Sequence, residues 1–307
     1  MTQPQWVAEI VVDAALAASL IAHAAPFLGG ASIEAFGNGW DNTAFLAGDS
    51  FLFRFPRRSV ASQLLEREIA CLGRIAQAVP LPIPLPEIIG APGADFPWSF
   101  YGYRLLVGQT LCTAIPDDVS RHALAKPLGG FLRALHAIDP RPFVARGLPP
   151  DEINRLEPER RTRQARERFT ALSEAEIVPA KFGELVEWLE EHPPVAGPHD
   201  ALRIVHGDLY ARHVLVNPLG EPAGIIDWGD IHFGDPALDL AVAHLVLPQV
   251  AHSDFLAAYG AVDERTWNAA RYRAIYHALL EMEYGNAVGD AALIGAGQTA
   301  LRFLHSA

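Results

Sequence analysis

The stretch that decides the fold reads His206-Gly207-Asp208-Leu209-Tyr210-Ala211-Arg212-His213, and Ile226-Asp227-Trp228-Gly229 follows it. The segment between them predicts a β-hairpin, with strands at Val214–Val216 and Gly224–Ile226 and a turn at Asn217–Gly220. A hairpin returns the chain to the end from which it started. We therefore expect the carboxylates of Asp208 and Asp227 to lie at one end of a short ribbon.

Two carboxylates in this order suit phosphoryl transfer, in which one lies beside the attacking hydroxyl and another binds Mg²⁺. Protein kinases have His-Arg-Asp, an Asn five residues after the Asp, and a later Asp-Phe-Gly. This chain has His-Gly-Asp ending at Asp208, His213 five residues later, and Asp-Trp-Gly beginning at Asp227. Ordinary turns between buried strands would not require these acids at this spacing. Asp208 is thus the candidate catalytic residue, and Asp227 is a candidate Mg²⁺ ligand.

His-Gly-Asp and the continuation Gly-Asp-Pro-Ala-Leu-Asp-Leu-Ala at 234–241 together resemble the aminoglycoside phosphotransferase (antibiotic kinase) family. The resemblance implies a bilobal, protein-kinase-like α+β fold. A small β-rich lobe over residues 1–107 would bind nucleotide, and a larger, mainly helical lobe over residues 108–307 would hold the catalytic and acceptor-binding groups. Structural roles are implied for three residues: His206, Asp235 at a helix start, and Asp239, which would hold the catalytic loop (His206–His213).

One position departs from the family pattern. The family usually has Asn where this chain has His213, and that Asn binds Mg²⁺ through its carbonyl oxygen. Mg²⁺ prefers oxygen, whereas imidazole is a softer ligand. Histidine here resembles the macrolide phosphotransferase branch of the family. Two interpretations stay open: His213 binds metal, which we favour, or it only packs near the loop.

Three strands are expected near the N-terminus, at Ser32–Phe36, Thr43–Leu46 and Ser50–Phe55. The turn after the first strand is a candidate phosphate-covering loop containing Gly37, Asn38 and Gly39. Its Gly-x-Gly lacks the third glycine of the kinase pattern, and a plain hairpin would have the same residues.

The third strand carries the second informative residue. Kinases place a lysine there to hold phosphates, but the only two lysines, Lys126 and Lys181, lie beyond the N-terminal lobe. Arg54 occupies the expected place, and its guanidinium can hold phosphate with a fork of donors. The next helix, expected at Ser62–Ala78, contains Glu68, which the family resemblance pairs with the strand cation.

Alternating prolines at Val79–Pro86 predict an extended connector. A further strand is expected at Ser99–Leu106, where the family has its hinge. The resemblance places the purine of ATP or GTP against the backbone of Arg104, Leu105 and Leu106. Side chains do not decide backbone contacts, so the sequence does not choose between the two nucleotides.

The C-terminal lobe contains three expected helices of interest. Arg121–Ile138 has leucines at helical spacing. Asp151–Phe169 is dense in mixed charges, which is typical of a solvated helix with internal ion pairs. The helix at 263–285 carries Glu281, Glu283 and Tyr284, candidates for recognising a cationic acceptor, although surface acids on a helix would look the same.

Composition limits the class of partner. The formal charge of −12 argues against a nucleic-acid surface and favours a cationic small molecule, although solubility alone also explains it.

Cys71 and Cys112 are expected to be buried and reduced. The apolar start Val7–Leu28 lacks a basic flank and contains Glu9 and Asp13, so it predicts an amphipathic helix and no membrane segment. We expect a cytoplasmic monomer or homodimer.

Three functions remain in competition, with Mg²⁺ and either ATP or GTP required for the first two. One is an O-phosphotransferase of an antibiotic, macrolide or aminoglycoside. Another is a kinase of a metabolite hydroxyl, such as an amino alcohol, a homoserine-like compound or a sugar. The last is a catalytically inactive nucleotide-binding regulator, which retention of Asp208 and Asp227 disfavours.

Overall fold

The computed structural model describes residues 8–114, 116–195 and 202–306, and the chain forms two compact units. The N-terminal unit comprises Met1–Gln77, Ile83–Leu106 and Asp227–Asp230. The C-terminal unit comprises Ala78–Pro82, Val107–Ile226 and Ile231–Ala307. The short segment Asp227–Asp230 therefore packs with the N-terminal unit, although most of its neighbours in sequence do not.

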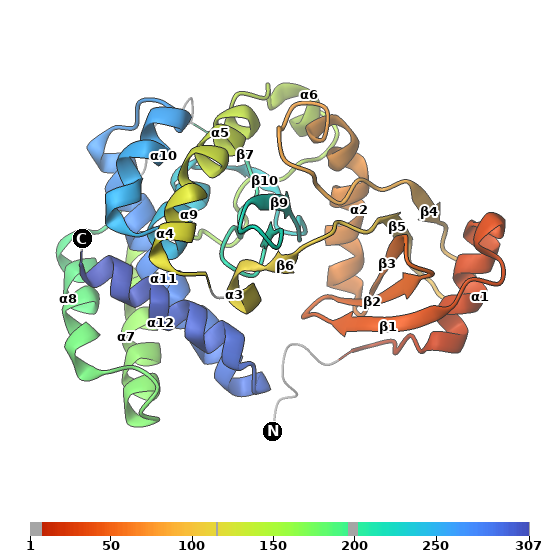
Figure 1. Cartoon of the computed structure of the whole chain (residues 1–307), viewed down its shortest axis with the longest axis horizontal. Helices are drawn as coiled ribbons and strands as arrows, with labels where there is room; N and C mark the ends of the chain where they lie inside the picture. Colours follow the sequence, from red (N-terminus) through yellow and green to blue (C-terminus); the bar gives the residue numbers. More distant parts are fainter. Residues whose placement is uncertain (1–7, 115, 196–201, 307) are drawn as a thin grey trace. The chain divides into compact units, whose positions relative to one another are not determined.

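A five-stranded antiparallel sheet, in the order β1-β2-β3-β5-β4, forms the centre of the N-terminal unit (Figure 1). Its strands are β1 (Ile33–Asn38), β2 (Asn42–Ala47), β3 (Phe51–Pro56), β4 (Ile88–Gly90) and β5 (Phe100–Arg104). The expected strands lie where they were predicted. The expected turn at Gly37 and Asn38 is wrong, because a register shift between Ala35 and Gly37 lets β1 continue until Asn38 pairs with Thr43.

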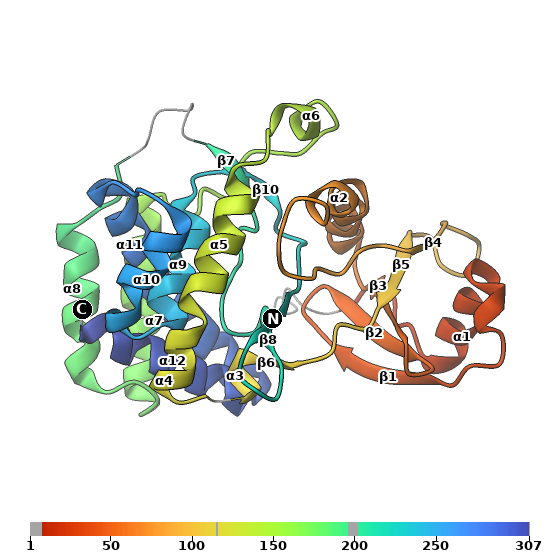
Figure 2. The same ribbon diagram turned by 45° about the horizontal axis from the view of Figure 1, so that its top comes forward.

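Two helices pack on opposite faces of this sheet, α1 (Ala14–Ala24) and α2 (Ser59–Ile75), and the 3₁₀ turn η1 (Pro26–Leu28) follows α1 (Figure 2). Side chains alternate along a strand, so Phe53 faces the core shared with α1 while Leu52 faces Leu65 of α2. The N-terminal helix is shorter than expected because Asp13 caps it by accepting a hydrogen bond from the backbone N–H of Leu16 at 2.8 Å.

Two small sheets belong to the C-terminal unit. One has the order β6-β8-β9, with β6 (Gln109–Thr110), β8 (Val214–Val216) and β9 (Pro222–Ile225), and the other pairs β7 (Arg203–Val205) with β10 (His232–Gly234). The expected hairpin is confirmed, since Val214 pairs with Ile225 and the backbone N–H of Gly220 bonds Asn217 across the turn.

Helices make up most of the C-terminal unit, and α11 packs against α7, α9 and α12 (Figure 1). The helices are α3 (Leu111–Ala114), α4 (Asp118–Ala123), α5 (Ala125–His136), α6 (Arg141–Val144), α7 (Pro158–Glu174), α8 (Gly183–Glu191), α9 (Ala237–Val246), α10 (His252–Tyr259), α11 (Glu264–Val288) and α12 (Ala291–His305), with 3₁₀ turns η2 (Ala180–Phe182) and η4 (Gln249–Ala251). The α+β class is confirmed.

Two expected helices have different bounds. The single helix at Arg121–Ile138 is wrong, because the chain forms α4 and α5 with a break at Leu124. Pro127 lies in the first turn of α5, where its missing N–H costs no intrahelical hydrogen bond. The charge-dense helix begins at Pro158, where the side chain of Glu157 caps it, and continues to Glu174.

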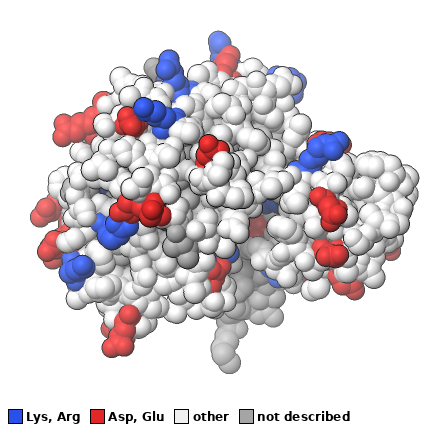
Figure 3. Space-filling view, viewed as in Figure 1, with Lys and Arg blue, Asp and Glu red and all other residues white. Residues whose placement is uncertain are grey.

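Other features concern the chain as a whole. Cys71 and Cys112 are buried, as expected, and neither forms a disulfide bond within the described residues. No helix in the described part of the chain combines the length and the apolar character needed to cross a membrane. The face in Figure 3 carries acidic and basic side chains interspersed, and they do not form a continuous basic surface there.

Candidate functional site

Arg54 is the centre of the polar cluster in the N-terminal unit. It lies on β3 and is 9% exposed. Its Nη1 donates to Oε2 of Glu68 at 2.6 Å, and its Nη2 donates to Oδ1 of Asp227 at 2.7 Å. The guanidinium fork therefore bridges two carboxylates, and the expected pair of Arg54 and Glu68 is present.

Local structure explains this cluster. Arg54 faces α2 because side chains alternate on β3, and Glu68 lies on the inner face of α2 with Leu65 and Leu72. Tyr101 pairs with Arg54 across β5 and donates its hydroxyl to Glu68 at 2.5 Å. Burial raises the pKa of Glu68 to about 7, although the Arg54 guanidinium opposes this shift. Sequence reasoning missed Tyr101, because the sequences of β3 and β5 do not indicate that these two strands pair.

Asp227 has a left-handed backbone, with φ of 63°, which is uncommon for a residue other than glycine. Its neighbour Trp228 is fully buried and fixes the turn. A Cβ added to Gly229 would lie 3.5 Å from Oε1 of Glu68, so the turn packs closely on α2. Backbone strain of this kind is concentrated at functional sites, and here it presents a carboxylate that is 47% exposed.

In the C-terminal unit, a buried carboxylate holds the catalytic loop. Asp239 on α9 accepts hydrogen bonds from the backbone N–H groups of His206 and Gly207, both at 2.8 Å, and bonds Nε2 of His136 at 3.1 Å. Burial alone would raise the pKa of Asp239, but the hydrogen bond and charge of His136, the charge of His206 and the Gly207 N–H lower it on balance. The contact expected between Asp239 and the loop is present.

The two histidines of the loop are oriented by backbone groups. His206 is fully buried, and its Nε2 lies 3.0 Å from the carbonyl oxygen of Ile226. His213 Nδ1 donates to the carbonyl oxygen of Asp208 at 2.7 Å. The neutral His213 ring then has its lone pair on Nε2. Metal-binding histidines have this arrangement, in which the other ring N–H is held by a carbonyl or carboxylate.

The residues fit a Mg²⁺ that binds together with nucleotide phosphates. Within residues 8–114, 116–195 and 202–306, no three or more His, Cys, Asp or Glu side chains form a metal cluster. Mg²⁺ is usually held by one or two carboxylates plus phosphates, so such a cluster is not required. Asp227, in the N-terminal unit, offers the hard oxygen that Mg²⁺ prefers.

Two basic residues that sequence reasoning missed lie beside Asp208. Nη2 of Arg273 and Nδ1 of His277, both on α11, are each 3.7 Å from Oδ1 of Asp208. Nδ1 of His213 is 3.8 Å from Oδ2. The available signal was the four-residue spacing of Arg273 and His277, which places both on one face of a helix.

The three candidates for binding a cationic acceptor lie in different surroundings on α11, and their role stays a prediction. Glu281 is 5% exposed, and burial, together with the Asp208 carboxylate, raises its pKa well above the usual value. Glu283 is exposed and forms an ion pair with Arg168 at 2.7 Å. Residues two apart in a helix point in different directions, which separates these acids, and Tyr284 is partly buried.

The candidate nucleotide residues have mixed outcomes. Gly37, Asn38 and Gly39 are all exposed. Arg104 is exposed and pairs with Glu87 at 3.2 Å. Leu106 is half-buried. These five residues, Gly37, Asn38, Gly39, Arg104 and Leu106, stay candidates for nucleotide contact.

Leu105 is the exception in the expected hinge. Its backbone N–H donates to the carbonyl oxygen of Ser50 at 2.8 Å. That N–H therefore has a partner within the N-terminal unit, and a purine contact by Leu105 would have to use its carbonyl oxygen; Leu105 stays a candidate on that condition. Sequence reasoning could not find this bond, because it depends on how the residue before β3 lies against the end of β5.

Comparison with known proteins identifies the family. The family model described as APH, Phosphotransferase enzyme family, matches residues 32–275, most of the chain. The chain belongs to this family. The likeness to solved structures covers nearly the whole chain, which confirms the kinase-like α+β fold.

Among the similar structures, a GDP complex of aminoglycoside 2'-phosphotransferase-IIIa has a TM-score of 0.67 and 22% identity, covering 96% of this chain and 99% of that one. Macrolide 2'-phosphotransferase MphH from Brachybacterium faecium, as apoenzyme, has a TM-score of 0.59 and 23% identity, covering 94% and 97%. A curated relative, "Uncharacterized protein YcbJ" of Bacillus subtilis (strain 168), is 28% identical over 64 residues, 21% of each protein. The match therefore spans only about a fifth of that relative.

Proposed function

We propose that this chain is a small-molecule kinase that transfers the γ-phosphate of ATP or GTP to a hydroxyl group. The observation that carries the proposal is the loop of Asp208, whose backbone is held by the buried Asp239 through two hydrogen bonds of 2.8 Å. A fixed loop gives a carboxylate the constant position that a base needs. Membership of the phosphotransferase enzyme family supports the same reaction.

Asp208 is the proposed catalytic base. Its carboxylate would accept a hydrogen bond from the acceptor hydroxyl, orient that oxygen and take its proton. The basic side chains of Arg273 and His277 lie at 3.7 Å from this carboxylate, which is beyond hydrogen-bond distance. The carboxylate is 26% exposed, which fits contact with a bound acceptor.

The N-terminal unit supplies the proposed phosphate-binding groups. Arg54 is held by Glu68 and points the other arm of its guanidinium toward Asp227, so it would fix nucleotide phosphates with a preoriented cation. Asp227 is the proposed Mg²⁺ ligand of the N-terminal unit, and His213 is the candidate ligand of the C-terminal unit. The ion, when bound, would neutralise charge on the transferred phosphate.

Two classes of acceptor are proposed, in order of preference. Antibiotics come first, because the similar structures include aminoglycoside and macrolide phosphotransferases, one of them in a GDP and kanamycin complex. A metabolite hydroxyl is the second candidate. Arg273 favours it, since a buried cation beside Asp208 suits an acceptor that is not itself strongly cationic.

The test is phosphate transfer from ATP and from GTP, with Mg²⁺, to macrolides, aminoglycosides and metabolite alcohols. Asp208→Ala should lower turnover by roughly 10²-fold or more, because general-base catalysis contributes on that scale. Nucleotide binding and the circular dichroism spectrum should be unchanged. Near-normal turnover of Asp208→Ala would overturn the assignment. Tight nucleotide binding without transfer to any acceptor would instead indicate the inactive regulator.

A further inference from the structure

One face of α11 carries three buried polar side chains with no hydrogen bonds. Arg273, His277 and Glu281 are 5%, 4% and 5% exposed, and their four-residue spacing places them on consecutive turns of one face. Within the described part of the chain, none of the three side chains makes a hydrogen bond, and Nε2 of His277 and Oε2 of Glu281 are fully buried without a partner.

Such a face is unusual for a structural element. More than nine in ten buried polar groups have a hydrogen-bond partner, and an unsatisfied one costs about 1–3 kcal/mol. Arg273 and His277 both lie 3.7 Å from the Asp208 carboxylate. The face therefore has unused hydrogen-bonding capacity beside Asp208, where the hydroxyl of the proposed acceptor would lie.

The charges on this face select the kind of acceptor. Arg273 is always protonated, whereas burial and the Asp208 carboxylate raise the pKa of Glu281 well above its usual value and so disfavour its charged form. Desolvation, together with Arg273, His213 and Arg155, lowers the pKa of His277 well below its usual value. A ligand that lies along this face therefore meets one full positive charge, that of Arg273.

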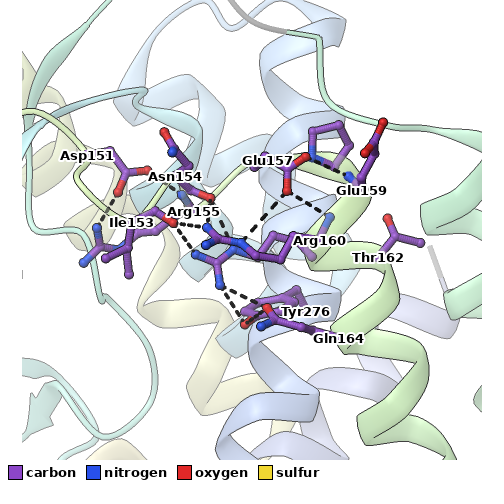
Figure 4. A network of polar contacts seen from close by, with 12 residues as sticks. Asp151, Ile153, Asn154, Arg155, Glu157, Glu159, Arg160, Thr162, Gln164 and Tyr276 are labelled. Atoms are coloured by element: carbon purple, nitrogen blue, oxygen red, sulfur yellow. Dashed lines mark hydrogen bonds and ion pairs between the residues drawn. The ribbon is translucent and has the colours of Figure 1, made fainter.

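A second buried arginine adds positive potential behind Arg273. Arg161 on α7 is 7% exposed, and its donors bond only uncharged acceptors: the carbonyl oxygens of Ile153 and Asn154, Oε1 of Gln164 and the hydroxyl of Tyr276. Figure 4 shows this network at the start of α7. The guanidinium carbons of Arg161 and Arg273 both lie over the Tyr276 ring, at 5.2 and 5.6 Å from its centre. Within the described residues, no carboxylate forms an ion pair with Arg161.

We propose that the acceptor carries an oxyanion, a carboxylate or a phosphate ester, and that Arg273 binds it beside the hydroxyl held by Asp208. This rests on the proposed kinase function. An arginine fork pairs with an oxyanion through two parallel hydrogen bonds, and the five donors of Arg273 have no hydrogen-bond acceptor in the structure. An ammonium group at the same place would meet like charge. The oxyanion and the attacked hydroxyl would be only a few bonds apart.

Arg273 has one competing role, which is to position Asp208 for every acceptor alike. The two roles differ in what the Arg273→Gln variant does. Loss of an oxyanion contact raises KM for anionic acceptors only, whereas loss of positioning lowers kcat for all acceptors. The test therefore needs acceptors that share one skeleton and differ only in charge.

Glucuronate, glucose and 6-amino-6-deoxyglucose form such a series, since they differ only at carbon 6. Wild-type protein should bind glucuronate roughly tenfold or more tightly than glucose, because a charge-assisted bidentate pair contributes a binding free energy of that size. It should bind the amine most weakly. Calorimetry measures binding, and phosphate transfer from ATP and GTP gives kcat/KM in the same order.

In Arg273→Gln the preference for glucuronate over glucose, measured as the ratio of their kcat/KM values, should disappear. Arg273→Lys should be intermediate because it keeps the charge and loses the fork. Arg168→Gln is the matched control, since Arg168 faces the same Tyr276 ring at 5.0 Å but pairs with Glu283. It should leave the preference intact.

Three results would overturn the inference: tighter binding of the amine, equal binding of all three sugars, or an equal fall for all three in Arg273→Gln. Asp208-dependent transfer to cationic acceptors alone would overturn it while the kinase function stands. Absence of transfer to any acceptor, including the macrolide and aminoglycoside panel, would reject the kinase function itself.

Discussion

Replacement of Asp239 by asparagine would remove one charge from the buried network that holds the catalytic loop. The asparagine carbonyl can take the place of Oδ2 and keep the contacts with His206 and His136, which lie at 2.8 and 3.1 Å. Its NH₂ group would then face the Gly207 N–H, 2.8 Å from the lost Oδ1, and that donor would have no acceptor. One stranded donor costs about 1–3 kcal/mol, and the two remaining bonds lose their charge assistance.

The expected loss of stability is therefore about 2–4 kcal/mol for Asp239→Asn, and more for Asp239→Ala, which strands all three donors. That is a large share of the roughly 5–15 kcal/mol that typically stabilises a domain. The catalytic loop would also lose its fixed backbone, so kcat should fall even where the protein remains folded.

The assay must report on the C-terminal unit, because the chain has two compact units and need not unfold in one step. Native-state hydrogen exchange of the His206 and Gly207 amides does so, since both donate to Asp239. In Asp239→Asn the Gly207 amide should exchange much faster, while amides of the five-stranded sheet keep their protection.

Asp254→Asn is the matched control. It makes the same chemical change at a carboxylate that is 41% exposed and pairs with His122 and Lys126, so it should cost less than about 1 kcal/mol. If Asp239→Asn cost no more than Asp254→Asn and left Gly207 protected, the buried carboxylate would not hold the loop.

The Asp239 carboxylate should also make the stability of the folded protein fall in acid. The pKa of Asp239 is lower in the folded protein than its ordinary value of 3.8. A group with a depressed folded pKa contributes stability that is fully present above the unfolded value and lost as pH falls through the folded value. Wild-type stability should therefore decline more steeply below about pH 4 than that of Asp239→Asn. Equal slopes in acid unfolding curves would contradict this.

Two further substitutions test other parts of the structure. In α5, a Cβ on Gly129 would lie 2.4 Å from the carbonyl oxygen of Phe255, so Gly129→Ala should lower the free energy of chemical unfolding by about 1–3 kcal/mol. A Cβ on Gly130 would meet nothing within 4 Å, so Gly130→Ala should raise that free energy by about 0.5–1 kcal/mol. In Arg54→Lys a single, shorter-reaching ammonium replaces the two guanidinium nitrogens that reach Glu68 and Asp227 separately, so nucleotide affinity measured by calorimetry should fall roughly tenfold. The exposed control Arg74→Lys should leave affinity unchanged; an equal effect of both would remove Arg54 from the nucleotide site.

Much of the N-terminal unit could be predicted because its signals are local. Alternation in β3 places Arg54 on the same face as Leu52, toward α2, and helical spacing in α2 places Glu68 inward, so their pairing needs only two correct periodicities. The end of β1 was missed because a register shift, which no residue type specifies, lets Gly37 and Asn38 continue the strand. The Tyr101 hydroxyl was missed for the related reason that strand order is not local.

The C-terminal unit shows where charge patterns mislead. Mixed charges near α7 predicted a solvated helix, yet Arg155 and Arg161 are each 7% exposed. Arg161 is drawn inward by carbonyl oxygens of the preceding loop, whose residue Asn154 has φ of 46°. That loop conformation depends on tertiary contacts and cannot be inferred from composition. The separation of Glu281 from Glu283, by contrast, follows from helical periodicity alone.

The buried polar groups around Asp208 are of two kinds, those that make hydrogen bonds within the fold and those that make none. Asp239 is buried and accepts three hydrogen bonds, so folding itself accounts for its presence. Within the described residues, the buried side chains of Arg273, His277 and Glu281 make no hydrogen bonds, which costs free energy in the folded protein. Because Arg273 and His277 lie 3.7 Å from the carboxylate of Asp208, the proposed base, we attribute this face to recognition of the proposed acceptor. The full positive charge of Arg273 therefore bears on the acceptor more directly than the overall charge of −12 does.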